Sequence, residues 1–138
     1  MVVNIQNVPN LKHQTASEGK SFSLDSVLGV TIFDLNGLPK EYYGTVENDD
    51  TSWIQVVFQT LGLELLFESA FQLGHFQYSI IHDTPNPAIV FKLRTYCVAF
   101  LLSPVNFRDV ADRIAAQINH FDPSLPISDP RFSVVVKP

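Results

Sequence analysis

The segment from Ser52 to Gln72 is the feature that most constrains how this chain can fold. It is too long for an ordinary strand, and the stretch Asn48–Thr51 before it has the residue types that cap a helix N-terminus. We therefore predict one long helix, whose apolar side chains form two faces instead of one. The first face holds Ile54, Val57, Phe58, Leu61 and Leu65, and the second, roughly opposite, holds Trp53, Val56, Leu63, Phe67 and Phe71.

A second apolar face on a surface helix needs a covering, because soluble monomers seldom expose a large patch of aromatic side chains. Trp53, Phe67 and Phe71 are also the kind of side chain that anchors protein interfaces. We expect this face to bind a second protein chain. The alternative is that the N-terminal tail or residues 122–138 cover it within one chain.

Five other segments have the branched and aromatic composition of strands. Asn36-Gly37 separates the first two and favours a tight hairpin in which both turn residues have positive φ. Pro39 restricts its strand to a sheet edge, or else lies at the start of the strand. The very short connection between the last two strands makes them antiparallel neighbours. The five strands are expected at 28–34, 38–46, 75–82, 88–93 and 95–102.

A second helix is predicted to start at Ser103-Pro104, a hydroxyl cap followed by proline at the first helical position, and to run to about Phe121. Its apolar residues, from Val105 onward, keep the spacing of a one-sided amphipathic helix. A short helix or single helical turn is expected over Ser23–Leu28. This element order predicts an α+β fold: a five-stranded antiparallel sheet with the long helix on one face and the C-terminal helix on the other.

The chain has 138 residues, which is the length of one domain. We expect an N-terminal tail at 1–20, the domain at 21–121, and a C-terminal tail at 122–138 whose branched run Phe132–Val136 can add a strand. The first residues lack the charged start and apolar core of a secretory signal, and no apolar run reaches the length of a membrane span. We therefore expect a cytoplasmic protein.

The charge of the chain is acidic, with a formal net charge of -5. Residues 41–91 contain seven carboxylates and no Lys or Arg. A nucleic-acid partner is not expected, because such binders carry a basic patch. The acidic stretch indicates either a solvated surface or a basic partner.

No catalytic or ligand motif is present in the context that it requires. The four histidines are scattered, and Cys97 lies in an apolar run typical of a buried strand. Glu64 and Glu68, four residues apart on the long helix, are more typical of a solvated stripe than of an acid–base pair. We expect no catalytic residues, no metal and no cofactor, and so no enzyme.

The segment Leu28–Leu102 resembles the Roadblock / dynein light chain family. The run Leu28–Pro39 is similar to the opening hairpin of that family, and the long helix and three strands follow in the family's order. The resemblance implies a non-enzymatic domain of profilin-like, longin-related fold that forms homodimers or heterodimers. In such dimers the long helices pack together, edge strands pair across the dimer, and the assembly serves as a scaffold or as a regulator of small Ras-like GTPases.

Carried onto this chain, the resemblance implies a dimer surface on the long helix and the strand 75–82. The candidate interface residues are Trp53, Val56, Leu63, Phe67, Phe71, Phe76 and Tyr78. Two features depart from the family: only Phe22–Leu28 stands where a longer first helix is usual, and the C-terminal tail is an addition. The alternative function is a small-molecule sensor of PAS-like type, with a pocket between sheet and long helix lined by Phe58, Phe76, Tyr78 and Phe100.

Overall fold

The computed structural model describes residues 3–6, 22–45, 50–71, 78–82 and 85–136. These residues form a mixed α+β structure in which every paired strand is antiparallel to its neighbour. Phe76 and part of the strand predicted at 75–82 lie outside the described residues, as do the side chains of Phe67 and Phe71.

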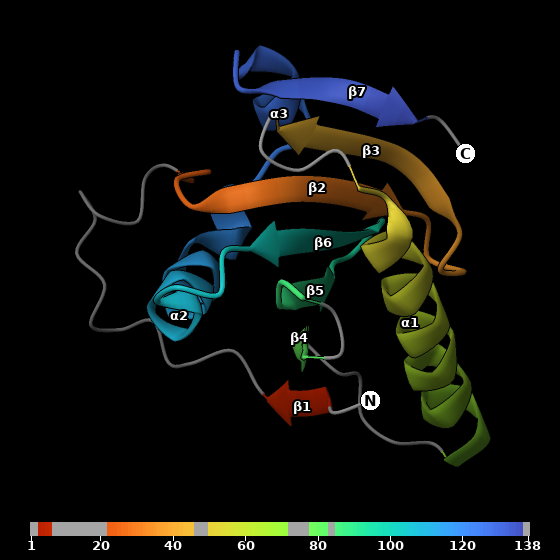
Figure 1. Ribbon diagram of the computed structural model, residues 1–138. Helices are drawn as coiled ribbons and strands as arrows, with labels where there is room; N and C mark the ends of the chain where they lie inside the picture. The colour runs from red at the N-terminus through yellow and green to blue at the C-terminus, as the bar shows by residue number, and fades with distance from the viewer. Residues whose placement is uncertain (1–2, 7–21, 46–49, 72–77, 83–84, 137–138) are drawn as a thin grey trace.

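The sheet has seven strands in the order β1-β4-β5-β6-β2-β3-β7, so the predicted count of five is wrong (Figure 1). The five predicted strands are its centre. Their observed bounds are Val27–Phe33 for β2, Pro39–Thr45 for β3, Tyr78–Ile81 for β4, Ala88–Lys92 for β5 and Cys97–Leu102 for β6.

The two additional strands come from the segments that the sequence places in the tails. β1 (Val3–Gln6) pairs with β4, and β7 (Phe132–Val136) pairs with β3. An edge strand presents unpaired backbone N–H and C=O groups, and pairing with a terminal segment satisfies them. Both edges of the five-stranded centre are therefore covered by the chain's own ends.

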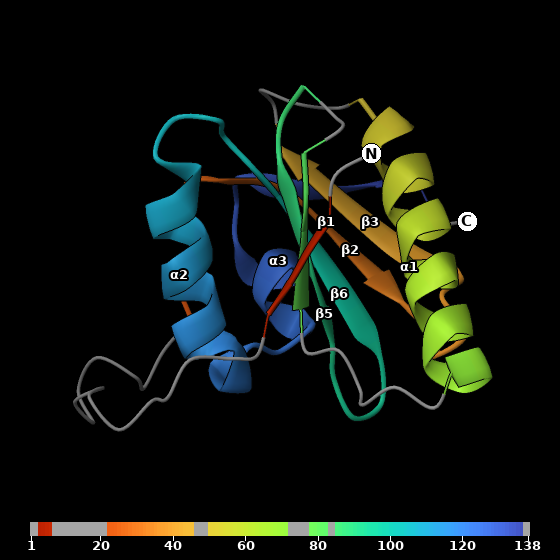
Figure 2. The same ribbon diagram turned by 90° about the horizontal axis from the view of Figure 1, so that it is seen from below.

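Two helices lie on opposite faces of the sheet, as predicted (Figure 2). α1 (Ser52–Phe71) covers one face, and α2 (Phe107–Gln117) covers the other, followed by the 3-10 turn η2 (Ile118–His120). The short helix α3 (Ser124–Ser128) leads into β7. β6 lies near the middle of this arrangement and all six of its residues are buried, which agrees with the doubly apolar pattern of its sequence.

Two helix starts differ from the predictions. Ser23–Leu28 forms no helix: the chain turns at Ser26, whose φ is 67°, and enters β2 at Val27. α2 begins at Phe107, three residues later than expected, because the Ser103 hydroxyl accepts a hydrogen bond from the Val105 N–H in a local turn. Val105, placed by its spacing on the apolar face of the helix, is consequently 71% exposed.

The β2–β3 hairpin is present, but its turn differs from the expected type. Only Gly37 has positive φ (86°); Asn36 does not. Asp34 organises the turn, because its carboxylate accepts hydrogen bonds from the N–H groups of Asn36 (2.9 Å) and Leu38 (3.0 Å). The bond from Leu38 is the main reason why the pKa of Asp34 lies below its usual value.

The two faces of the sheet carry side chains of different size. The α2 side holds a cluster of large rings, with Phe22, Phe91 and Phe121 around Phe100. The α1 side presents smaller residues on its central strands, including Ala88, Val90 and Ala99. Small residues allow a helix to approach a sheet closely, and α1 packs against β5 on this face.

Tyr43 gives a test of the α2-side core that depends on pH. Its ring is 1% exposed, and its hydroxyl has no hydrogen-bond partner among the described residues. Burial, with a smaller contribution from the Glu41 carboxylate, raises the pKa of Tyr43 to about 12. The folded protein therefore favours the neutral phenol, and this contribution to stability is complete below the unfolded pKa of about 10 and is lost as pH rises to 12.

We expect Tyr43→Phe to unfold at neutral pH with a free energy equal to or slightly above that of the wild type, since no hydrogen bond is lost. Between pH 10 and 12 the variant should lose less stability than the wild type. Urea unfolding at pH 7, 10 and 11 measures both effects. Equal losses in the two proteins at high pH would show that the Tyr43 phenol does not resist ionisation.

Candidate functional site: the outer surface of helix α1

Helix α1 starts where the sequence predicts. One carboxylate oxygen of Asp50 accepts a hydrogen bond from the Ser52 N–H (3.0 Å), and the other accepts one from the Ser52 hydroxyl (2.8 Å). These bonds satisfy a backbone donor at the helix start and, with the N–H group as the largest cause, hold the pKa of Asp50 below its usual value. Asp50 is thus occupied in fixing the helix and is not a free acid.

The side of α1 that faces the sheet is formed by Trp53, Val57 and Leu61. The Trp53 indole N–H donates to the Tyr42 hydroxyl (3.3 Å), and the two rings meet edge to face at 5.6 Å. The Tyr42 hydroxyl in turn donates to the Asp50 carbonyl oxygen (3.3 Å). A Cβ at Gly29 would lie 3.1 Å from the Tyr42 ring and 3.2 Å from the Trp53 ring, so a larger residue there would require these rings to shift by a few tenths of an ångström.

The opposite side of α1 is exposed and carries no charge over its described length. It consists of Gln55, Gln59, Gly62, Leu63 and Leu66, which we call the outer stripe. Leu63 and Leu66 are 47% and 58% exposed. Four of these residues follow one another at intervals of four, three and four positions: Gln55, Gln59, Gly62 and Leu66. This alternating spacing is typical of the row of residues along which one helix contacts another.

Gly62 is the most open position of the stripe. Apart from the backbone of the helix itself, no heavy atom of the described residues lies within 4 Å of the place that a Cβ would take, so nothing in the described part of the chain requires a glycine there. Glycine in a helix interior costs about 1 kcal/mol relative to alanine. A residue that weakens the helix without an internal reason is favourable where a second chain must come close to the backbone.

The predicted interface residues are divided by this geometry. Leu63 is on the outer stripe, and Val56 is half-buried at the edge of the sheet-facing side. Trp53 and Tyr78 are each 3% exposed and belong to the two cores, Trp53 under α1 and Tyr78 under α2. Neither is available to a partner in this structure, and Tyr78 lies on the opposite face of the sheet from α1.

The residues that the sequence analysis missed are Gln55, Gln59, Gly62 and Leu66. An apolar scale selects against glutamine and glycine, so three of these positions were not marked, and Leu66, although apolar, belongs to neither of the two predicted faces. Their signal was the absence of charge: Ser52–Phe71 contains only Glu64 and Glu68 as charged residues, which is few for a helix at a surface.

The β2–β3 hairpin lies beside α1 and extends the apolar surface. A Cβ placed at Gly37 would lie in van der Waals contact with α1, 3.5 Å from the Leu65 side chain and 3.6 Å from that of Leu61. Leu35 and Leu38, on either side of this turn, are 42% and 49% exposed. These exposed leucines therefore flank a turn that packs against the Leu61 and Leu65 side of α1.

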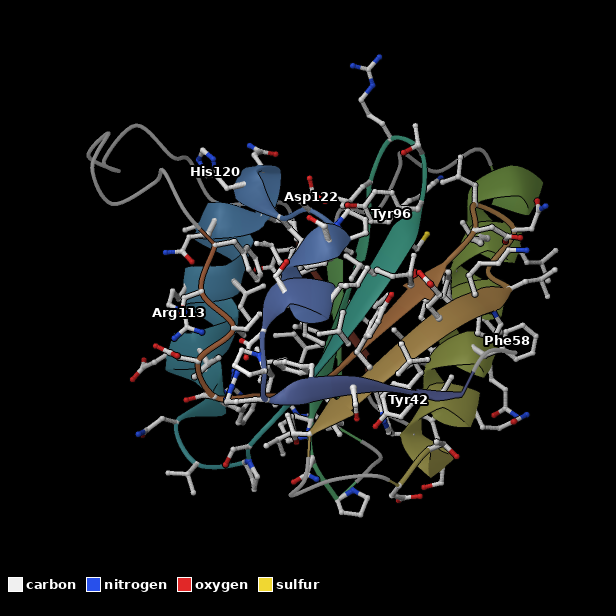
Figure 3. The ribbon with its side chains drawn as sticks, turned by 90° about the horizontal axis from the view of Figure 1, so that it is seen from above. Tyr42, Phe58, Tyr96, Arg113, His120 and Asp122 are labelled. Atoms are coloured by element: carbon white, nitrogen blue, oxygen red, sulfur yellow. The ribbon has the colours of Figure 1, made fainter. Side chains whose placement is uncertain are left out.

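The pocket predicted for a PAS-like sensor is not formed by its proposed residues. Phe58 projects from α1, away from α2 (Figure 3), and packs at the margin of the α1-side core. Tyr78 and Phe100 belong to the α2-side core. Because the sheet separates them from Phe58, these three side chains cannot line one cavity. Phe76 lies outside the described residues, and the sensor function itself stays a prediction.

A hollow of about 570 Å³ lies beside the start of α2, between Ser26, Asn106 and Arg113. The Arg113 guanidinium donates to the carbonyl oxygens of Ser23 (3.3 Å) and Asp25 (2.5 Å). It thereby fixes the segment before β2 against α2. The polar groups of this hollow thus serve the packing of the chain itself.

Chemical groups for metal binding are not gathered in the described part of the chain. No three residues of the types His, Cys, Asp and Glu lie close enough there to hold a metal ion. Cys97 is buried in β6. Asp122 resembles Asp50 in that its carboxylate accepts a hydrogen bond from the Ser124 N–H (2.8 Å) at the start of α3, which lowers its pKa.

Comparison with known proteins does not assign a family. No protein-family model matches the chain, and no curated protein matches it. Among the described helices, none combines the length and the apolar character needed to cross a membrane.

Proposed function

We propose that this protein is a cytoplasmic, non-enzymatic interaction module of Roadblock type, which pairs with itself or a related subunit through the outer stripe of α1. The observation that carries the proposal is the stripe itself: an uncharged, exposed row with an open glycine at its centre and two leucines beside it. The motif resemblance of Leu28–Pro39 and the element order support the same assignment.

The pairing of β1 with β4 favours a dimer contact other than the one that the resemblance implies. The family resemblance implies pairing through the strand after the long helix, which is β4 here. The outer edge of β4 is taken by β1, with Val3 opposite Ile81 and Gln6 opposite Tyr78. A continuous sheet across the dimer at β4 would require β1 to leave, so we assign the contact to α1 and the adjoining hairpin.

The size of this contact predicts a modest affinity. A helix of 20 residues is about 30 Å long, and one face of it buries less than the roughly 800 Å² per partner of a standard stable interface. Leu35 and Leu38 of the hairpin add to the buried area, but they do not supply a second helix or strand to the contact. We therefore expect a dimer that dissociates on dilution.

The decisive variant is Gly62→Arg. Within one chain the new side chain meets no heavy atom near its Cβ, and arginine favours helix over glycine by roughly 0.7–1 kcal/mol. The monomer should be as stable as the wild type or more stable. In the dimer the side chain and its charge fall between two close helices, so association should weaken at least about tenfold, or 1.4 kcal/mol.

Light scattering with size exclusion over a dilution series measures this effect as a shift from twice 15.5 kDa to 15.5 kDa. Asn119→Arg is the matched control, because it adds the same charge at an exposed position after α2. A wild-type chain that is monomeric at high concentration, or a Gly62→Arg chain that dimerises like the wild type, would refute the assignment.

The client implied by the resemblance is a small Ras-like GTPase. Binding of purified Ras-like GTPases, loaded with GDP or with a non-hydrolysable GTP analogue, can be measured by calorimetry with wild type and Gly62→Arg. We expect binding that depends on the dimer and is therefore weakened by the variant. Binding that Gly62→Arg leaves unchanged would separate the client site from the dimer.

A further inference from the structure

The segment Phe22–Asp25, which we call the strap, precedes β2 on the α2 side of the domain and belongs to no helix or strand. Its two apolar side chains, Phe22 and Leu24, are 8% and 7% exposed in the α2-side core. The Phe22 ring lies 5.4 Å from that of Phe100 and 5.2 Å from that of Phe121. The strap therefore covers part of the ring cluster on this face of the sheet.

The backbone of the strap is held by side chains instead of by a neighbouring strand. The Arg113 guanidinium of α2 donates to the carbonyl oxygens of Ser23 and Asp25 (Figure 3). The Leu24 carbonyl oxygen, which lies between them in the chain, accepts a hydrogen bond from the Arg131 guanidinium (2.6 Å). Three consecutive carbonyl groups are thus bound by two arginines, one from α2 and one from the segment that leads into β7.

Arg131 is itself positioned by its neighbours at the start of β7. Its backbone N–H donates to the Asp129 carboxylate (2.9 Å), and its Nε lies 3.7 Å from the same carboxylate oxygen. Its guanidinium lies 5.0 Å from the centre of the Phe132 ring, which is 7% exposed in the α2-side core. Phe132 also pairs with Thr45 of β3, so the donor that holds the strap is fixed by the seating of β7 on the sheet.

Each end of the described chain therefore stabilises the other. If β7 leaves β3, the Leu24 carbonyl loses its charged donor, and if the strap leaves, the Arg131 guanidinium loses its acceptor. Such a coupling has the same size in both directions. It joins two segments that are 107 residues apart in sequence.

The sheet can stay intact when these two segments leave it. β7 is the outermost strand beyond β3, and its pairing shifts register between Tyr42 and Tyr43, so the ladder that it forms is short. β3 keeps its pairing with β2, which begins after the strap. Segments with few backbone ladder bonds are the ones that open locally at a small free energy.

We propose that the strap and β7 form one latch: the two segments open together, in a local transition that leaves the rest of the domain folded. Opening uncovers the edge of β3 from Tyr42 to Thr45, where all four residues are buried in the closed state. It also uncovers the Phe100 ring beneath Phe22. The latch involves neither α1 nor its outer stripe, and it does not depend on the proposed function.

Hydrogen exchange of the full chain, resolved for single amides, tests whether the two segments open together. Val134→Gly changes β7 at a position that is 51% exposed. We expect the amides of β7 to exchange about fivefold faster in this variant, because glycine weakens a strand. If the latch opens as one unit, the Ser23 amide, which donates to the Gln117 side chain (3.3 Å), accelerates by the same factor.

Val105→Gly is the matched control, since it makes the same change at a 71% exposed position before α2. It should leave the exchange of the Ser23 amide and of β7 unchanged. An Arg131→Ala background tests the link between the two segments. In that background Val134→Gly should still accelerate β7, but it should change the exchange of the Ser23 amide by less than about twofold.

A Ser23 amide that keeps its wild-type exchange rate in Val134→Gly would overturn the proposal, because the strap would then open by itself. Acceleration of Ser23 and β7 by Val105→Gly would overturn it too, and so would buried β6 amides that exchange as fast as those of β7, because the opening would then be unfolding of the whole domain. Equal acceleration of Ser23 with and without the Arg131 side chain would show that Arg131 does not join the two segments.

Discussion

Phe100→Ala should lower the free energy of unfolding by about 3–5 kcal/mol, the usual cost of removing a large buried ring. Phe100 is 0% exposed on β6. Its ring lies 5.4 Å from that of Phe22, 5.2 Å from Phe121 and 6.1 Å from Phe91, mostly in edge-to-face geometry. The cavity cannot close easily, because these neighbours come from the segment before β2, from the residue that follows η2 and from β5.

Urea unfolding followed by circular dichroism measures this change in the free energy of unfolding. If the slope of that free energy against urea concentration stays the same, the variant still folds to the same compact state. Val105→Ala is the control, since that side chain is 71% exposed and its loss should change stability by less than about 0.5 kcal/mol. If Phe100→Ala lowers the free energy of unfolding by less than about 1 kcal/mol, the Phe100 ring is not enclosed. Phe22 would then not pack against this ring on the sheet.

The central elements were predictable from local patterns. Branched and aromatic runs, the Asn36-Gly37 turn and the length of Ser52–Gln72 identify β2 to β6 and α1, and Pro39 is found at the start of β3 as expected. Each of these signals concerns residues close together in the chain. The helix starts at Ser103 and Ser23 were mistaken because local hydroxyl turns use the same residue types as helix caps.

The outer strands were harder to predict, because their partners are remote in sequence. Val3–Gln6 pairs with β4 more than 70 residues later, and Phe132–Val136 pairs with β3 about 90 residues earlier. No turn connects either pair, so neither short apolar run carries a signal for where it docks. Local composition marks Phe132–Val136 as a run that can add a strand, but it does not identify the sheet edge that the strand joins.

The orientation of α1 could not be read from its own apolar residues, since these occur all round the helix. The sheet determines the orientation, because Gly29 leaves room for the Trp53 ring, which faces inward. For the same reason Tyr78 was misplaced, because alternation along β4 tells which residues share a face but not which helix covers that face.

Trp53→Ala should destabilise the monomer by about 3–5 kcal/mol, in contrast to the effect expected of an interface residue. The indole is 3% exposed, packs against Tyr42 and donates a hydrogen bond to its hydroxyl. Removing it leaves a cavity beneath the first turns of α1 and breaks the link that runs through Tyr42 to the Asp50 carbonyl. Trp53→Phe keeps most of the ring and loses the N–H, so its cost should be closer to 1 kcal/mol.

Trp53 is the only tryptophan of the chain, which permits a second measurement on the wild type. If the indole is enclosed under α1, its emission maximum should stay the same while light scattering shows dissociation on dilution. If the outer stripe is the contact, Gly62→Arg should dissociate with that emission unchanged. A Trp53→Ala chain that unfolds like the wild type but no longer associates would reverse the assignment, because the inner side of α1 would then face the partner and the outer stripe would face solvent.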